Sequence, residues 1–420
     1  MRFFAVSFLF IAGIVNYLDR TSFSIANTSI RADLDLSGTQ IGALLSAFSL
    51  AYGAAQLPIG LMLDRVGSRA ILAAGMFLWS LAQMATGLVS SFAGFMATRI
   101  SLGAGEAPMM PCGVKVMNDW FGVRDRGLPT GLLTASNTLG VTLAPPVLTV
   151  IMLAFGWRAM FVSVGLFSLL LSLAWYPLYR DRGSVSLTPA EAESLGLETE
   201  RPRTEMSWRQ WKRLFRKRTM WGMMLGFGGV NYTTWLYLSW LPGYLQAERH
   251  LTIARTGWVA IIPYLFGTIG SLVSGATANR LIRRGAAPIL ASKILIVGGM
   301  FCSALNTLGV AYAPTATGAV VCVSIALFFI YFAGNAGWGL AQALAPAHMV
   351  ASVSAIQNFG SFVCASLAPI ITGWLLDHTH SFHIALMICS LATTLGALSY
   401  WFIVKHPIDP GAAATPLASR

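Results

Sequence analysis

The chain has 420 residues, of which 55% are hydrophobic and 10% are charged. Soluble globular proteins carry roughly 25% charged residues, so this composition excludes a soluble enzyme and indicates a multi-pass membrane protein. The formal net charge of +12 does not indicate a nucleic-acid-binding protein, because the positive residues gather in a few connecting segments.

Twelve apolar windows of at least 18 residues predict twelve transmembrane spans. The windows lie at about 3–26, 41–62, 70–89, 92–117, 128–153, 158–178, 220–245, 252–277, 287–309, 315–345, 350–376 and 382–404. The first window lacks a signal-peptide cleavage site and ends in the polar sequence NYLDR, so we interpret it as a retained span.

The positive residues predict the orientation of the chain in the membrane. With both termini in the cytoplasm, the inner segments hold 20 of the 28 lysines and arginines, whereas the outer loops hold Arg31, Arg158, Arg249 and Arg255. The positive-inside rule therefore favours an orientation with both termini cytoplasmic.

The spans divide into two groups of six. We predict one six-helix bundle over 1–178 and a second over 220–404. Between them, 179–219 is a cytoplasmic linker that includes the basic sequence SWRQWKRLFRKRT, whose aromatic and apolar residues recur at helical spacing. Such a segment is typical of an amphipathic helix on an anionic membrane surface. The tail, 405–420, is predicted to be disordered.

A weak internal repeat supports the division into halves. Asn16 and Tyr17 recur as Asn231 and Tyr232, and the loop residues Gly60, Asp64, Arg65 and Arg69 recur at the same offset as Gly275, Asn279, Arg280 and Arg284. The repeat indicates two pseudo-symmetric bundles.

Four charged residues interrupt the apolar spans of the first half. Asp19 and Arg20 lie in the first span, and Arg99 and Glu106 lie seven residues apart in the fourth, on one helix face and about 10 Å apart along the axis. A charge at mid-bilayer costs on the order of 3 kcal/mol, so these side chains are expected to face the bundle interior or water. A static ion-pair network and a functional site are both open, and we favour the functional site.

Several motifs resemble those of the major facilitator superfamily. GLMLDRVGSRA between the second and third spans is similar to its loop signature, departing at Ser68. NYLDR, RISLGAGEAPMMP, NDWFGVRDRG, GWRAMF and LSWLPGYL resemble the anion:cation symporter family, which includes bacterial proton symporters for galactonate, glucarate and hexuronates and is related to sialin and the vesicular glutamate transporters.

The resemblance implies an all-α protein of the bacterial inner membrane with twelve transmembrane helices in two six-helix bundles. It also implies roles for individual residues. Asp19 and Glu106 are the proton-coupling acids. The substrate-binding residues are Arg20, Arg99, Tyr17, Tyr52, Asn137, Asn335, Trp338 and Asn358. The gating residues are Asp64, Arg65, Arg69, Asn231 and Tyr232.

The charged residues suggest how a proton and an anion could travel together. A carboxylate paired with an arginine holds a proton weakly, and it holds a proton more firmly once an anionic substrate has taken over that arginine. Asp19 and Glu106 can therefore take up protons, while Arg20 and Arg99 hold the substrate carboxylate or couple it to protonation. Which acid binds the first proton stays open.

We therefore predict a proton-coupled symporter, not an enzyme, that imports an organic anion such as an aldonate, aldarate or hexuronate by alternating access. GAGEAP lacks the G-K-[ST] of a nucleotide loop, and its glycines are better explained by close helix packing. We expect no metal, no other cofactor and no nucleic-acid partner; the energy source is the proton gradient, and the chain is expected to be a monomer in the lipid bilayer.

Two other functions stay open. The first is a carrier of an aromatic or small carboxylate such as phthalate, which the polar Asn137, Asn335 and Asn358 disfavour. The second is an uncoupled anion uniporter or channel, which the acids Asp19 and Glu106 disfavour.

Overall fold

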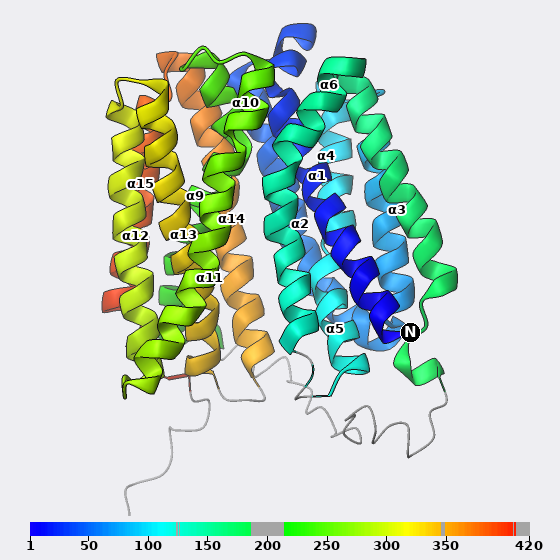
Figure 1. The fold of residues 1–420 in the computed structure, drawn as a ribbon, viewed down its shortest axis with the longest axis vertical. Helices are drawn as coiled ribbons and strands as arrows, with labels where there is room; N and C mark the ends of the chain where they lie inside the picture. The colour runs from blue at the N-terminus through cyan, green and yellow to red at the C-terminus, as the bar shows by residue number, and fades with distance from the viewer. Residues whose placement is uncertain (123–124, 126, 186–213, 346–348, 406, 409–420) are drawn as a thin grey trace, which may run out of the picture. The chain divides into compact units, whose positions relative to one another are not determined.

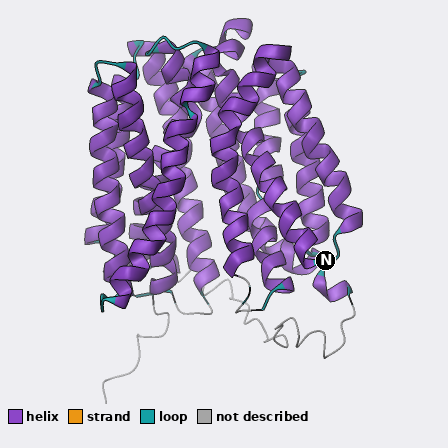
Figure 2. Cartoon of the chain, viewed as in Figure 1, coloured by secondary structure: helices purple, strands orange, loops and turns teal. Residues whose placement is uncertain are grey.

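The computed structural model consists of helices and short loops in the part of the chain that it describes (Figure 2). The described residues are all except 123–124, 126, 186–213, 346–348, 406 and 409–420. Residues 207–213 of the predicted amphipathic helix and most of the tail therefore lie outside the described residues.

The helices of the first half follow the predicted spans closely. They are α1 (Arg2–Leu34), α2 (Gly38–Val66), α3 (Ser68–Thr86), α4 (Phe92–Glu106), α5 (Met109–Trp120) and α6 (Gly127–Leu178), labelled as in Figure 1. A short 3-10 turn, Arg182–Ser184, follows α6.

The second half contains a corresponding series. Its helices are α9 (Arg218–Ala247), α10 (Ile253–Val259), α11 (Ile261–Arg283), α12 (Pro288–Tyr312), α13 (Ala316–Leu344), α14 (Val350–Thr379) and α15 (His383–Phe402). Within this half, α12 and α13 pack side by side (Figure 1).

Three local breaks explain why the observed helices do not correspond one to one with the twelve predicted spans. The 52 residues of α6 hold two predicted spans, separated where Gly156 adopts a φ of 82°, a conformation that favours glycine. The fourth span is broken at Ala107 and Pro108 into α4 and α5, and the eighth is broken at Ala260 into α10 and α11. By length and composition alone, seven helices of the described part could cross a membrane, and α6 counts once among them.

Glycines let the helices of the first half approach closely. A Cβ on Gly103 of α4 would meet the backbone oxygen of Phe48 on α2, and a Cβ on Gly105 would lie 2.7 Å from the backbone nitrogen of Trp79 on α3. The structure confirms that the GAGEAP sequence serves close helix packing. This packing fixes the end of α4, where Glu106 lies.

The contacts within the chain define two compact units. The first contains residues 1–201, 235–265 and 366–385, and the second contains 202–234, 266–365 and 386–420. Because the first unit includes the C-terminal parts of α9 and α14, these units differ from the predicted bundles, whose boundaries stay a prediction.

Within the first unit, the C-terminal parts of α9 and α14 contact α1 and α2. The hydroxyl of Ser24 donates to the backbone oxygen of Ser239 at 2.7 Å. Asp377 accepts hydrogen bonds from the backbone N–H groups of Gly38 at 2.6 Å and Thr39 at 2.7 Å, and from the Thr39 hydroxyl at 2.6 Å. Asp377 therefore caps the first turn of α2, where unpaired N–H groups favour an anion.

Candidate functional site

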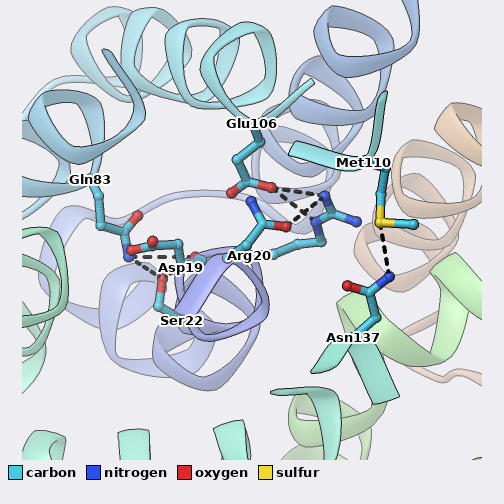
Figure 3. Close-up of polar contacts among 8 residues, drawn as sticks. Asp19, Arg20, Ser22, Gln83, Glu106, Met110 and Asn137 are labelled. Carbon is cyan, nitrogen blue, oxygen red and sulfur yellow. Dashed lines mark hydrogen bonds and ion pairs between the residues drawn. The ribbon is translucent and has the colours of Figure 1, made fainter. Parts of the chain in front are cut away.

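A buried ion pair joins α1 to α4 in the first unit. The Nε and Nη2 atoms of Arg20 lie 3.2 and 2.8 Å from Oε2 of Glu106, and the two side chains are 7% and 0% exposed (Figure 3). The other carboxylate oxygen of Glu106, Oε1, has no hydrogen-bond partner among the described residues. The pair is thus buried without being fully satisfied, as expected of partners that can exchange.

Four aromatic rings surround the Arg20 guanidinium. Its Cζ lies 4.8 Å from the ring centres of both Tyr17 and Tyr52, 5.2 Å from that of Phe48 and 5.7 Å from that of Trp235. Each distance is within the range of cation–π attraction. The sequence predicted Tyr17 and Tyr52 as site residues and did not place Phe48 or Trp235 beside them. Phe48 lies one helical turn before Tyr52, which was the only signal for it.

The other two charged residues do not form an ion pair with each other. The Oδ2 atom of Asp19 accepts a hydrogen bond from the Ser168 hydroxyl of α6 at 2.7 Å, and its Oδ1 atom has no partner among the described residues. Arg99 donates through Nη2 to the Gln83 side-chain oxygen at 3.4 Å and to the Thr86 hydroxyl at 3.2 Å. Asp19 and Arg99 are 0% and 1% exposed.

The site thus has two parts within the first unit. Arg20 and Glu106 form one part, and Asp19, Ser168, Gln83 and Arg99 form the other. All four predicted charges are buried on α1 and α4, but the structure joins only Arg20 to Glu106. Gln83 and Ser168 were not among the predicted site residues. An amide in an apolar span was the signal that could have indicated Gln83.

Asn137 of α6 lies close to the ion pair (Figure 3). Its side-chain nitrogen donates a weak hydrogen bond to the sulfur of Met110 at 3.4 Å. A Cβ on Gly13 of α1 would lie 3.6 Å from the side-chain oxygen of Asn137. Asn137 is therefore packed between α1 and α5, and its amide retains hydrogen-bonding capacity.

The remaining predicted substrate residues belong to the second unit. Asn335 and Trp338 are exposed side chains three residues apart on α13, and they therefore share one face of that helix. The ring of Trp338 packs edge-on against Phe227 at 5.3 Å. Asn358 on α14 is half-buried, and its backbone oxygen accepts a hydrogen bond from Ser361.

The predicted gating residues fall into two sets. Asn231 of α9 donates to the Ser361 hydroxyl of α14 at 2.6 Å, whereas the hydroxyl of Tyr232 is buried and has no hydrogen-bond partner among the described residues. The position of the Asp64 side chain is outside what the structure describes, and Arg65 is exposed.

Arg69 connects α3 to the end of α6. Its Nε donates to the backbone oxygen of Tyr176 at 2.7 Å, and its Cζ lies 4.3 Å from the Tyr176 ring centre. Its backbone N–H and that of Ser68 bond to Asp181, which caps α3. Arg69 is therefore tied to residues of its own unit, and its role as a gate stays a prediction.

Comparison with known proteins gives the family. The family model of the Major Facilitator Superfamily matches residues 9–369. The chain is 53% identical over 406 residues to the probable L-galactonate transporter of Escherichia coli K12, with 96% of this chain and 90% of that protein covered. It is 30% identical over 421 residues to the probable galactarate/D-glucarate transporter GarP of the same strain, covering 96% and 94%.

A solved structure supports the fold independently. A bacterial homologue of the human lysosomal transporter Spinster, in an inward-facing and unoccupied conformation, matches with a TM-score of 0.81 at 17% identity, covering 96% of this chain and 97% of that one. The predicted all-helical fold and the predicted resemblance are thereby confirmed. The chain belongs to the major facilitator superfamily and is a multi-pass membrane transporter, not an enzyme.

Proposed function

We propose that this transporter imports a sugar acid together with protons, by alternating access. The observation that carries the proposal is the buried pair of Arg20 and Glu106 within four aromatic rings. The names of the relatives support the substrate class, because they describe transporters of L-galactonate and of galactarate and D-glucarate, and another relative, 28% identical over 396 residues, is a hexuronate transporter of Bacillus subtilis.

In this mechanism, a substrate carboxylate replaces Glu106 as the partner of Arg20. The Arg20 guanidinium offers a planar fork of donors that suits a carboxylate, and its Nη1 atom makes no hydrogen bond with the described residues. Once Arg20 is engaged by the substrate, Glu106 is left in a buried site where a negative charge is costly. Glu106 then takes up a proton, so that anion and proton move together.

The second acid gives a second place for a proton. Asp19 forms no ion pair with an arginine among the described residues, and its carboxylate accepts a hydrogen bond from the neutral Ser168 hydroxyl. A buried carboxyl group without an ion-pair partner is costly to ionise. We propose that Asp19 carries a proton while Arg20 and Glu106 are paired.

Hydroxyl recognition is assigned to the polar and aromatic residues. Tyr17, Tyr52 and Asn137 of the first unit offer donors and acceptors for hydroxyl groups. Asn335, Trp338 and Asn358 of the second unit stay proposed substrate-binding residues. We propose cytoplasmic termini, as the distribution of arginines and lysines favours.

Uptake into proteoliposomes tests the proposal. The purified protein is assayed with galactonate, glucarate, glucuronate and phthalate, with and without an inward proton gradient. We expect accumulation of one sugar acid only when the gradient is present. Equal uptake without the gradient would establish an uncoupled carrier, and selective uptake of phthalate would replace sugar acids with aromatic carboxylates as the substrate class.

A further inference from the structure

Gln83 of α3 lies between the two charged groups of the second part of the site. Its side-chain oxygen accepts from Nη2 of Arg99 at 3.4 Å. Its side-chain nitrogen donates to the Ser22 hydroxyl at 2.8 Å and, at 3.4 Å, to the backbone oxygen of Asp19 (Figure 3). One amide therefore holds Arg99 on one side and the α1 segment that carries Asp19 on the other.

Gln83 is held in a fixed position. The residue is 0% exposed, and both ends of its amide are hydrogen-bonded. Breaking either contact would leave a buried polar atom unsatisfied, which is unfavourable. The side chain is thus anchored firmly enough to position a neighbouring charge.

Arg99 would otherwise have a strong reason to pair with Asp19. The guanidinium is 1% exposed, its Nε atom has no partner among the described residues, and the acceptors of its Nη2 atom are both neutral. Its Cζ atom also lies 4.9 and 5.9 Å from the ring centres of Phe23 and Phe161. The charges that act on Asp19 are those of Arg99 and Glu106, both from α4, whereas its neutral neighbours are Ser168 of α6 and Trp79 of α3. The proton affinity of Asp19 therefore depends on how closely Arg99 approaches it.

We propose that Gln83 is a positioning residue that holds Arg99 apart from Asp19 and so sets the pH range in which Asp19 binds the transported proton. The inference rests on the proposed proton coupling. An arginine released from Gln83 would pair with Asp19 and favour its ionised form, and proton binding would then require a more acidic solution.

Two substitutions of Gln83 test this proposal, because they should shift the pH of half-maximal uptake in opposite directions. Gln83→Leu removes both hydrogen bonds and releases Arg99, so the pH of half-maximal gradient-driven uptake should fall by on the order of one unit. Gln83→Glu places an anion that keeps Arg99 on α3 and adds negative charge near Asp19, so the same pH should rise. General damage to the fold would lower uptake without moving the two profiles in opposite directions.

Ser80→Ala is the matched control. Ser80 lies on the same helix, is 0% exposed and donates only to the backbone oxygen of Met76, so its removal should leave the pH profile unchanged. Sugar-acid counterflow without a proton gradient verifies that each variant is folded and binds substrate. If Gln83→Leu does not fold, the Gln83→Glu variant alone tests the inference. A pH profile of uptake that is unchanged in this variant, or shifted to lower pH, would overturn the inference.

The possible outcomes separate the inference from the proposed function. A wild-type protein that is driven by the gradient, with Gln83 variants of unchanged profile, would overturn the role of Gln83 and leave the symporter intact. Wild-type uptake that ignores the gradient would overturn the proposed function and this inference with it.

Discussion

At the residue scale, the chemistry depends on which partner each charged side chain has. Arg20 has Glu106 and four rings, whereas Asp19 has a serine and Arg99 has an amide and a hydroxyl. The sequence predicted that all four charges face the bundle interior or water, because a charge in lipid is costly. It could not predict their pairing, which depends on where α3 and α6 place Gln83 and Ser168.

Arg20→Lys tests whether the planar fork and the cage of rings matter. Lysine keeps the positive charge but loses the second donor to Glu106 and the stacking geometry, so sugar-acid uptake should fall by at least about tenfold, mainly through a higher KM. Initial rates in proteoliposomes over a range of substrate concentrations would measure this.

Arg158→Lys provides the control for that substitution. Arg158 also contacts a carboxylate, Asp33 at 3.4 Å, and a ring, Trp157 at 4.2 Å, but its side chain is 44% exposed. Its replacement should leave KM unchanged. An equal rise of KM in both variants would contradict the specific role of Arg20.

At the element scale, glycines and caps determine how the helices meet. The twelve apolar windows correspond to the observed helices because length and hydropathy suffice to predict a span. The breaks at Gly156 and at Ala107 and Pro108 lie at residues whose backbone preferences suit an interruption of a helix. The contacts of Asp377 with α2 were not predictable, because they join residues more than 330 positions apart.

Gly103→Ala should disturb the packing of α4 on α2. The added methyl would meet backbone atoms of Phe48 and Tyr52, which cannot move aside as a side chain can, so we expect a loss of about 1–3 kcal/mol in stability. Thermal unfolding in detergent would report it as a lower Tm. Gly298→Ala on α12 is the control, since a Cβ there meets nothing within 4 Å, and an equal loss in both variants would contradict the packing role.

Asp377→Asn should weaken the contact between α14 and α2. The substitution replaces charge-assisted hydrogen bonds at a helix N-terminus, each worth about 1.5–3 kcal/mol, so separation of these helices should become about tenfold more frequent or more. The labelling rate of a single cysteine introduced at Ser46 with a membrane-impermeant maleimide measures this.

Asp33→Asn is the control for the labelling experiment. Asp33 accepts from Trp157 at 2.7 Å, a contact between α1 and α6 that does not involve α14. The cysteine introduced at Ser46 should be labelled at the same rate in the Asp33→Asn variant as in the protein that retains Asp33. Slow labelling of the Asp377→Asn variant would contradict the proposal that Asp377 holds these helices together.

At the scale of the whole molecule, the central claim is that anion binding and proton binding share Arg20 and Glu106. The sequence predicts the superfamily and the fold, which the comparisons confirm. The names of two relatives describe transporters of sugar acids. In the proposed coupling, the substrate carboxylate and Glu106 compete for Arg20, so the coupling must be observed as a linkage between substrate binding and proton binding.

The most direct measurement is the pH change when a sugar acid is added to the purified protein in weakly buffered detergent solution. We predict that the wild-type protein takes up protons as the substrate binds, and that Glu106→Gln binds the substrate with a smaller uptake. Substrate binding that leaves the pH unchanged throughout the working range would contradict the exchange of partners at Arg20.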